Sequence, residues 1–424
     1  MVRSGFESRT ADWLGVDEAL ARILGEASPL APERAPLHEC LGRALAEDVI
    51  AEATLPPWDN SAMDGFAVRG EDVTGAGAEA PVRLDVIGRV RAGERSERAI
   101  GPGQAMRIMT GAPLPSGADA VVRVEDTDAE AEPGVVVVRS DRDVGQNVRP
   151  AGQDMRRGER LLPRGHRVTP GTIGVLAAAG RADAPVHRRP TVAVLTTGDE
   201  LRGPDRYEDV RAGRGIPDSN GPMIAALVSA VAGRPLLLSP AEDQPEALRA
   251  RIAEAEAADL LITVGGASMG EADLVKRVLD ELGYRSGFWR VRMRPGSPVG
   301  FGWLPRGARL QPVLSLPGNP TSAFVTFEVL ARPLLLRLGG HERTSRRRVT
   351  ARAAEPIRAP ARLTYYLRVS LDDTQDGLCA RLTGPQGSGL VSGLARAGGL
   401  AVIGEDVAGV AEGDAVTVLL LSEA

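Results

Sequence analysis

A glycine pair followed by a serine and two carboxylates stands out in the stretch LLITVGGASMGEADL. Gly265 and Gly266 let a ligand approach the backbone closely, and the next helix would offer its free N–H groups and positive dipole end to an anion. Ser268 and Glu271 have the spacing of a capping box. Asp273 lies beyond that cap, where a carboxylate suits a metal ion that bridges phosphates. The stretch therefore predicts a phosphate site.

Two alternatives exist for the same stretch. Asp273 has the spacing to form a surface ion pair with Lys276 or Arg277, which contributes only about 0.2–0.5 kcal/mol. The letters GASMG also match G-x-S-x-G, the nucleophile turn of α/β-hydrolases. A hydrolase needs a histidine downstream of that serine. Only His341 follows it, and we place this residue at the start of a different domain.

Three further loops follow apolar runs and open helical stretches. In LPGNPTSAF, a Pro-Gly turn leads to an Asn that would adopt left-handed geometry or cap the helix. In DSNGPM, the Ser or the Asn would cap the next helix. Because the carboxyl ends of parallel strands meet at one edge of a sheet, we expect these loops to lie together. The candidate binding residues are Ser219, Asn220, Pro317, Gly318, Asn319 and Pro320, and Glu200 in TTGDEL is a candidate metal ligand or base.

Residues 288–298, FWRVRMRPGSP, alternate strictly. A strand with this pattern places Phe288, Arg290, Arg292 and Arg294 on one face. Such a face is often simply exposed, but three arginines on it also suit phosphate or another oxyanion.

Polar residues also gather in two Gly- and Pro-rich stretches, PPWDNSAMDGFAV and RIMTGAPLPSGADAVVRVED. Turn chemistry accounts for most of them, and their spacing alone assigns no reaction. They are Asp59, Asn60, Ser61, Asp64, Thr110 and Asp119.

The elements that must position these residues follow from the apolar pattern. Between residues 190 and 340, short apolar runs alternate with helical stretches, as in βαβ units around a parallel sheet with helices on both faces. Two other regions have short β-like runs between Gly and Pro. We predict a multidomain α/β plus β protein with a central doubly wound, mostly parallel α/β domain, an inserted β-rich domain and a small C-terminal β-domain. The predicted boundaries are 1–50 with 155–187 for a discontinuous first domain, 51–154 for the insert, 188–340 for the α/β domain and 341–424 for the last.

Composition narrows the function. The 424 residues carry a formal net charge of −5 and only 3% aromatic residues, which argues against a nucleic-acid surface. The two cysteines do not suggest a disulfide framework. The sequence shows neither a signal-peptide pattern nor an apolar run of membrane-spanning length. We therefore expect a cytoplasmic protein without nucleic-acid or membrane partners.

Eight motifs, in their order along the chain, closely resemble the molybdopterin molybdenumtransferase family, which includes MoeA and the gephyrin E domain. The resemblance covers nearly the whole chain and implies an elongated four-domain homodimer with an α/β domain of the molybdopterin-binding type. Its active cleft would lie between the α/β domain of one subunit and the other domains, partly from the partner. The motifs are DNSAMDGFA, MTGAPLPSGADAVV, QNVRPAGQDMRRGERLL, LTTGDEL, DSNGPM, TVGGASMGEAD, MRPGSPVGFG and LPGNPTSAF.

The resemblance also implies a reaction. Adenylylated molybdopterin and molybdate would be the substrates, a divalent metal such as Mg²⁺ would assist cleavage of the pyrophosphate link, AMP would leave, and molybdenum would remain on the dithiolene sulfurs. The molybdopterin adenylyltransferase is a further expected partner. By motif match, the implied catalytic residues are Asp64, Thr110, Glu200 and Asp273, the implied metal ligands are Glu200, Asp243 and Asp273, and Asp154, Arg290, Arg294 and Arg368 would bind substrate. The two Gly loops would cradle the pterin phosphate or nucleotide, and Ser268 would contact it.

Two departures from the family are visible. Ser297 stands where the family usually has Lys, and Ala397-Gly398 where it often has Ala-Asn. We hypothesise that Arg292 supplies the missing cation at position 297. Two alternative functions are a molybdopterin adenylyltransferase, which the α/β domain alone also resembles, and a non-enzymatic scaffold of the kind that gephyrin forms.

Overall fold

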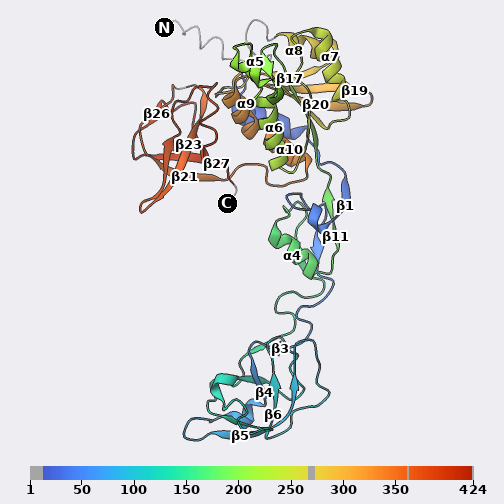
Figure 1. Cartoon of the computed structure of the whole chain (residues 1–424), viewed down its shortest axis with the longest axis vertical. Coiled ribbons are helices and arrows are strands. Elements are labelled where there is room, and N and C mark those ends of the chain that lie inside the picture. The colour runs from blue at the N-terminus through green and yellow to red at the C-terminus, as the bar shows by residue number, and fades with distance from the viewer. Residues whose placement is uncertain (1–12, 266–272, 361, 423–424) are drawn as a thin grey trace. The chain divides into compact units, whose positions relative to one another are not determined.

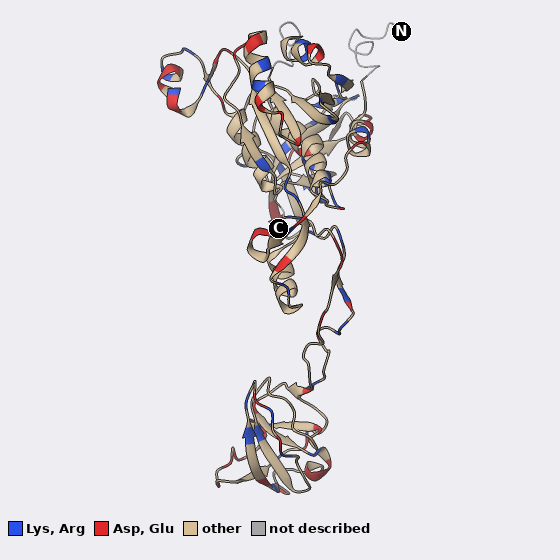
Figure 2. Cartoon of the chain, turned by 90° about the vertical axis from the view of Figure 1, so that its right-hand side faces the viewer, with Lys and Arg blue, Asp and Glu red and all other residues tan. Residues whose placement is uncertain are grey.

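The computed structural model describes residues 13–265, 273–360 and 362–422. By internal contacts the chain divides into two compact units. The first comprises residues 1–47, 164–173 and 183–424, and the second comprises residues 48–163 and 174–182. Figure 1 traces the chain through both units, and Figure 2 shows that both signs of charge are spread over each of them.

A six-stranded mixed sheet forms the centre of the first unit. β12 pairs in parallel with β15 and β16, and β16 pairs in parallel with β20. β19 is antiparallel to both of its neighbours, β20 and β17. In sheet order the strands are β15 (Arg234–Leu237), β12 (Thr191–Thr196), β16 (Leu260–Val264), β20 (Arg309–Leu316), β19 (Gly300–Arg306) and β17 (Arg285–Trp289).

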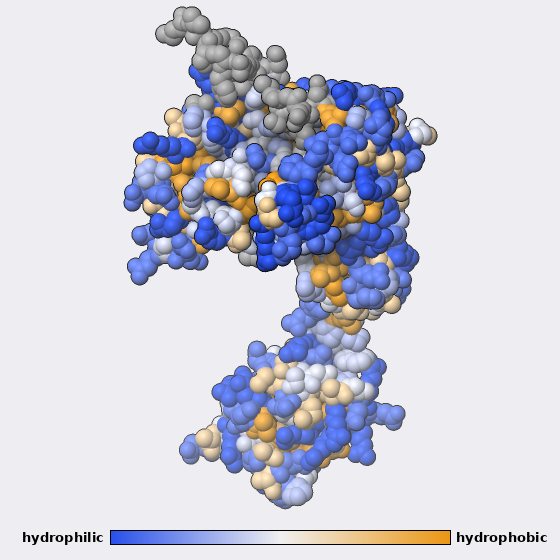
Figure 3. Space-filling view, turned by 45° about the horizontal axis from the view of Figure 1, so that its top comes forward, coloured by the Kyte–Doolittle hydropathy of each residue, from blue (hydrophilic) through white to orange (hydrophobic). Residues whose placement is uncertain are grey.

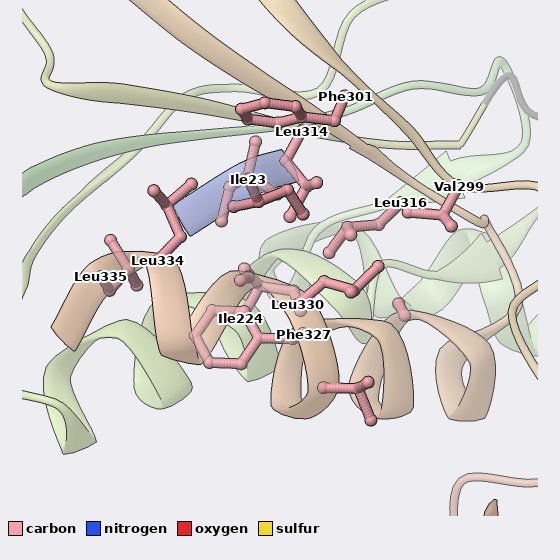
Figure 4. Close-up of a cluster of buried hydrophobic side chains, with 14 of the residues drawn as sticks. Ile23, Ile224, Val299, Phe301, Leu314, Leu316, Phe327, Leu330, Leu334 and Leu335 are labelled. Atoms are coloured by element: carbon pink, nitrogen blue, oxygen red, sulfur yellow. The ribbon is translucent and has the colours of Figure 1, made fainter. Parts of the chain in front are cut away.

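Helices cover both faces of this sheet, which confirms the predicted doubly wound fold (Figure 1). On one face, Ile23, Ile224, Leu316 and Phe327 belong to a large buried cluster (Figure 4). That face is covered by α2 (Val16–Gly25), α6 (Asn220–Ala230), α9 (Pro320–Thr326), a π-helical turn (Phe327–Ala331) and α10 (Arg332–Leu338), and the other by α7 (Pro245–Glu254) and α8 (Asp273–Glu281). The excursion after β12 contains β13 (Leu201–Arg202), a 3₁₀ turn (Pro204–Arg206), α5 (Tyr207–Arg211) and β14 (Ile216–Pro217).

The C-terminal part of the first unit is a small barrel. β23 pairs with both β24 and β25, and this double pairing closes the sheet on itself. The predicted C-terminal β-domain is thus present. Its strands are β21 (Arg348–Ala353), β23 (Thr364–Thr374), β24 (Gly377–Leu382), β25 (Gly399–Ile403) and β27 (Ala415–Leu420), with β18 (Met293–Arg294) added beside β23 and a separate pair, β22 (Ile357–Arg358) and β26 (Gly409–Val410).

The second unit is β-rich, as predicted for the insert. Its five-stranded sheet is β7 (Ala120–Arg123), β4 (Gly65–Val68), β6 (Gln104–Ile108), β5 (Val82–Val90) and β8 (Val135–Val138), with α3 (Gly70–Val73) and a 3₁₀ turn (Val124–Asp126). Two short pairs complete it: β3 (Asn60–Ser61) with β9 (Val148–Arg149), and β2 (Val49–Ile50) with β10 (Arg160–Leu162). β1 (Pro32–Pro36), a 3₁₀ turn (Leu37–Glu39) and β11 (Asp183–His187) belong to the first unit, and α4 (Pro170–Ala178) crosses the boundary.

None of the helices within the described residues has the length and hydrophobicity needed to span a bilayer. The space-filling view shows largely hydrophilic surface with smaller hydrophobic areas (Figure 3).

A buried charged cluster joins the end of the α/β domain to the barrel. Glu328, in the π-helical turn, accepts two hydrogen bonds from Arg346, at 2.9 and 3.1 Å. Arg332 is only 3% exposed and donates to the carbonyl of Thr344 at 3.0 Å. His341 is 5% exposed, and burial, together with the positive charges of Arg167 and Arg332, lowers its pKa to about 4.

We expect His341→Gln to reduce the loss of stability in acid. In the parent the unfolded chain binds a proton near pH 6.5 and the folded chain only near pH 4, so the free energy of unfolding falls as the pH drops between these values. Chemical denaturation measures the free energy of unfolding at pH 7 and at pH 5. The decrease between these two pH values should be smaller by about 2 kcal/mol in the variant than in the parent. An equal decrease in the free energy of unfolding of parent and variant would contradict a neutral buried His341. The control is His38→Gln, a substitution at an exposed histidine.

Candidate functional site

Three neighbouring parallel strands end side by side and bring their loops together. Thr197 follows β12, Gly265 follows β16, and Gly318 lies two residues beyond β20. Gly265 has a φ of +111°, and a methyl group on it would lie 2.7 Å from the Thr197 carbonyl oxygen. A methyl group on Gly318 would lie 3.3 Å from Cα of Gly265. The strand ends therefore form a close-packed backbone cradle, with no room for a side chain on Gly265 and little room for one on Gly318.

Two oxygens at this cradle are buried without a hydrogen-bond partner in the part of the chain that the structure describes. Thr197 is 6% exposed and Asn220 is 8% exposed. Neither Thr197 Oγ1 nor Asn220 Oδ1 has a hydrogen-bond partner among the described residues, although Asn220 Nδ2 donates to the Gly318 carbonyl at 2.7 Å. Because buried polar groups are rarely left unsatisfied, both oxygens suit a bound ligand. Sequence reasoning missed Thr197, whose only signal is a hydroxyl directly before the Gly of a strand-end loop.

We expect Thr197→Val to weaken substrate binding without loss of stability. The substitution keeps the shape and removes a hydroxyl that has no partner among the described residues, so its effect on unfolding should be neutral or favourable. The KM for the substrate should rise about tenfold if the hydroxyl bonds the ligand. Thr196→Val is the matched control, because Thr196 Oγ1 donates to Asp218 at 2.9 Å and its loss should lower stability. An unchanged KM in Thr197→Val would remove this residue from the site.

The start of α6 differs from the prediction. Neither Ser219 nor Asn220 caps the helix with its side chain. Asp218 does so instead: its Oδ1 accepts from the Gly221 N–H at 3.0 Å, and its Oδ2 accepts from Thr196. Asp218 therefore fixes the helix to the strand end, which leaves Asn220 to bridge toward Gly318.

The acidic residues Glu200 and Asp243 lie on exposed loops at the same edge. Asp199 Oδ1 accepts from the Asp243 backbone N–H at 2.9 Å, and the Gly198 N–H donates to the Ala241 carbonyl, so the two loops are tied together. Carboxylates at this position are hard oxygen donors of the kind that Mg²⁺ binds. Within the described part of the chain, no group of three or more His, Cys, Asp or Glu residues forms a metal site, so the magnesium ligands stay a prediction.

The opening motif is only partly described. Gly266, Ser268 and Glu271 lie outside the described residues, and Asp273 is the first residue of α8. Lys276, one proposed partner of Asp273, pairs with Asp280 at 2.6 Å.

His341, which a hydrolase would require as its catalytic base, is buried beside Arg167 and Arg332 and has a lowered pKa. A buried histidine that resists protonation is poorly suited to that role.

The predicted continuous strand over 288–298 is wrong. β17 ends at Trp289, and Arg290 has a φ of +108°, which breaks the alternation. The end of β17 nevertheless lies at the edge of the sheet that carries the site. β17 runs parallel to β20, because both strands are antiparallel to β19. Its carboxyl end therefore places Arg290 at the same edge as the cradle, about 10 Å from β20 at ordinary strand spacing.

The three arginines have different surroundings. Arg290 lies over the ring of Trp13 at 5.3 Å, and Arg294 is exposed at 6.0 Å from the ring of Tyr365. Arg292 is bound elsewhere: its Nε donates to Glu405 at 2.9 Å and its guanidinium also donates to the Trp13 carbonyl. This geometry contradicts the hypothesis that Arg292 replaces the family's lysine. Ser297, at that position, donates its hydroxyl to the Met293 carbonyl.

The PGNP loop opens α9 as predicted, with Pro320 in the first turn. Asn319 has an extended backbone conformation and makes no side-chain cap bond, so the predicted left-handed or capping role is wrong. Its carboxamide lies 3.9 Å from the position of a methyl group on Gly389, in the 384–390 loop of the barrel.

Arg368 is completely buried, at 0% exposure, which contradicts a direct contact with substrate. Its guanidinium donates to the Thr321 hydroxyl at 2.6 Å and to several main-chain carbonyls, those of Leu390 and Pro385 both at 2.8 Å. Burial lowers the pKa of Arg368. The side chain holds the 384–390 loop against the start of α9, next to the PGNP loop.

In the second unit, Asp64 and Thr110 are paired. Asp64 Oδ1 accepts from the Thr110 backbone N–H at 2.7 Å and from its hydroxyl at 2.9 Å. These two hydrogen bonds lower the pKa of Asp64 and keep it ionised at neutral pH. Asp154 lies on a different loop of the same unit and lines a cavity with Asn60 and Arg149.

The class of the protein follows from this geometry together with comparisons to known sequences. Residues 193–337 match the family described as a probable molybdopterin binding domain. Residues 14–180 match the MoeA N-terminal region (domain I and II), and residues 350–421 match the MoeA C-terminal region (domain IV).

Relatives that match over nearly the full length of the chain indicate the same family. The chain is 37% identical over 388 residues to molybdopterin molybdenumtransferase 2 of Mycobacterium tuberculosis, covering 90% of this chain and 93% of that protein. It is 35% identical over 420 residues to the molybdopterin molybdenumtransferase of Bacillus subtilis, covering 98% and 96%. A crystal structure of the molybdopterin biosynthesis protein moeA from Pyrococcus horikoshii OT3 has a TM-score of 0.82 at 27% identity and covers 96% of this chain and 100% of that one. The chain belongs to the MoeA family of molybdopterin molybdenumtransferases.

Proposed function

We propose that this chain inserts molybdate into adenylylated molybdopterin, which releases AMP and yields molybdenum-molybdopterin. The observation that carries the proposal is the cradle of Thr197, Gly265 and Gly318, where Thr197 Oγ1 and Asn220 Oδ1 are buried without a hydrogen-bond partner among the described residues. The pterin phosphate or the nucleotide would lie in this cradle. The reaction would take place in the cytoplasm, in a homodimer that receives its substrate from the molybdopterin adenylyltransferase.

The residues have separate roles in this proposal. Glu200, Asp243 and Asp273 would hold Mg²⁺, which neutralises charge on the pyrophosphate when bound. Arg290 and Arg294 supply positive charge toward molybdate or phosphate. Asp64, kept ionised by Thr110, offers a carboxylate from the second unit. Arg368 positions the barrel loop beside the PGNP turn, without touching substrate.

The test is incubation of the full-length chain with adenylylated molybdopterin, Mg²⁺ and molybdate, with AMP release and protein-bound or pterin-bound molybdenum as the two measurements. A parallel reaction with tungstate measures selectivity between the oxyanions. Incubation with ATP and unmodified molybdopterin tests the adenylyltransferase alternative. AMP release without molybdenum transfer, or adenylylation from ATP, would contradict the proposed reaction.

A further inference from the structure

In the first unit, the segment before α2 lies along the chain that follows β17. Leu14 forms a parallel bridge with Val291, and the Arg292 backbone N–H donates to the Leu14 carbonyl at 2.8 Å. The N–H of Thr364, the first residue of β23, donates to the Arg292 carbonyl at 3.1 Å. Three segments that are distant in the sequence therefore meet at Arg292: the one before α2, the one after β17 and a strand of the barrel.

The side chain of Arg292 holds Trp13 in place. Its guanidinium donates to the Trp13 carbonyl, and its Nε donates to Glu405 at 2.9 Å. A methyl group on Gly15 would lie 3.3 Å from this guanidinium, so the backbone of the segment lies directly against the arginine. The position of Trp13 is thus tied to Arg292 and, through the ion pair with Glu405, to the barrel.

The ring of Trp13 supports Arg290. The Arg290 guanidinium lies over the indole, 5.3 Å from the ring centroid, and indole is the aromatic group that attracts a cation over its face most strongly. The backbone of Arg290 has a φ of +108°, which residues other than glycine rarely adopt and which is more frequent at functional sites. Its N–H donates to the Val299 carbonyl at 2.8 Å. Both the backbone and the side chain of Arg290 are therefore held by neighbours.

Arg294, the other arginine that we assign to an oxyanion, also lies against an aromatic ring. Its guanidinium is 6.0 Å from the ring of Tyr365, its partner in the pairing of β18 with β23. An arginine loses much rotamer freedom when it binds a ligand, and a side chain that is held beforehand loses less. Its planar set of donors is then ready for an oxyanion.

We propose that Trp13 is a positioning residue for the oxyanion site. Its ring holds the Arg290 guanidinium at the edge of the sheet that carries the cradle, and Arg292 holds Trp13. The proposal rests on the function proposed above, because that function supplies two oxyanions, molybdate and the phosphate of AMP. Arg292 thus acts indirectly: it fixes the ring on which Arg290 lies and does not bind the oxyanion itself.

The test is the binding of molybdate and of AMP to the full-length chain, each measured by equilibrium dialysis. Trp13→Leu should weaken oxyanion binding about fivefold, because a partly exposed cation–π contact contributes roughly this factor. Trp13→Phe keeps a ring and should restore most of the loss. Arg292→Met should also weaken binding, because it releases the Trp13 carbonyl. The control is Tyr207→Leu, which removes the exposed ring beneath Arg211 on α5 and should leave binding unchanged.

A double-mutant cycle separates positioning from general packing. In an Arg290→Met background, Trp13→Leu should cause no further loss of oxyanion binding, because the ring acts through the arginine that it holds. A loss confined to molybdate identifies molybdate as the oxyanion at Arg290, and a loss confined to AMP identifies the phosphate. Melting temperatures show whether each variant folds, and Arg292→Met gives the same comparison with the ring intact if Trp13→Leu does not.

Three results would overturn the proposal: no saturable binding of molybdate or AMP to the parent, equal binding by Trp13→Leu and the control, or an equal loss from Trp13→Leu with and without Arg290. The transfer reaction separates this inference from the proposed function. A parent that transfers molybdenum, with a Trp13→Leu variant that binds both oxyanions normally, contradicts the positioning role alone. A parent whose oxyanion binding depends on Trp13 through Arg290 but which transfers no molybdenum contradicts the proposed function alone.

Discussion

Arg368→Met should lower the free energy of unfolding of the first unit by about 4 kcal/mol or more. The guanidinium is fully buried and bonds the Thr321 hydroxyl and the carbonyls of Pro385 and Leu390. Each hydrogen bond from a charged group contributes about 1.5–3 kcal/mol, and methionine can make none of the three. Chemical denaturation of parent and variant measures the difference.

Two further variants sharpen this result. Arg368→Lys keeps the charge but has fewer donors and no planar fork, so it should recover only part of the loss. Arg381→Met removes an exposed arginine from the neighbouring strand of the same barrel and should change stability by less than about 0.5 kcal/mol. Hydrogen exchange at Thr321, whose N–H donates to the Ser388 carbonyl, should accelerate in Arg368→Met. A variant as stable as the Arg381 control would contradict a structural role for this arginine.

Asp273→Asn should reduce the rate of AMP release by about 100-fold or more while the melting temperature stays near that of the parent. Asp273 begins α8 after the loop that follows β16, and in the proposed reaction its carboxylate binds the metal that stabilises charge on the pyrophosphate. Loss of one such electrostatic contact typically costs about 10²–10³ in rate. AMP release under saturating substrate and Mg²⁺ is the measurement.

The control for Asp273 lies on the same helix. Asp280→Asn removes a carboxylate that is 46% exposed and pairs with Lys276, so it should leave AMP release within about twofold. A titration with Mg²⁺ adds a second readout, because a lost ligand should raise the metal concentration needed for half-maximal rate. Normal turnover at the parent's Mg²⁺ requirement would exclude Asp273 from the metal site.

Much of the fold could be predicted because its pattern is local. The apolar runs that became β12, β16 and β20 are separated by helical stretches, and this alternation is typical of a parallel sheet covered on both faces. The antiparallel half of the sheet was not predicted. β19 pairs with β20 through a tight hairpin, and its sequence GFGWLPR lacks the alternation that marks a strand. Residues 300–306 form a strand because they pair with β20, and their own sequence pattern does not predict it.

The site was predictable as a set of loops but not as a set of contacts. Gly265 and Gly318 could be found because strand-end glycines have a local backbone reason. The partners of Arg292 could not, because Glu405 lies 113 residues away. Arg368 was assigned to the substrate by the family resemblance alone, and a charged residue in a strand gives no sign that carbonyls will enclose it. Thr197 was recognised only in the structure, because the sequence does not show that its buried hydroxyl has no hydrogen-bond partner among the described residues.

The pairing of β1 with β11 bears on the order in which a ribosome can complete this protein. Pro36 lies opposite Asp183 in that pair, and the whole second unit lies between them in the chain. At about 5–20 residues per second, roughly 8–30 s pass before the first strand meets its partner. The second unit, whose five-stranded sheet lies within residues 65–138, is synthesised during that interval. It is therefore expected to fold first during translation, before β1 and β11 of the first unit can pair.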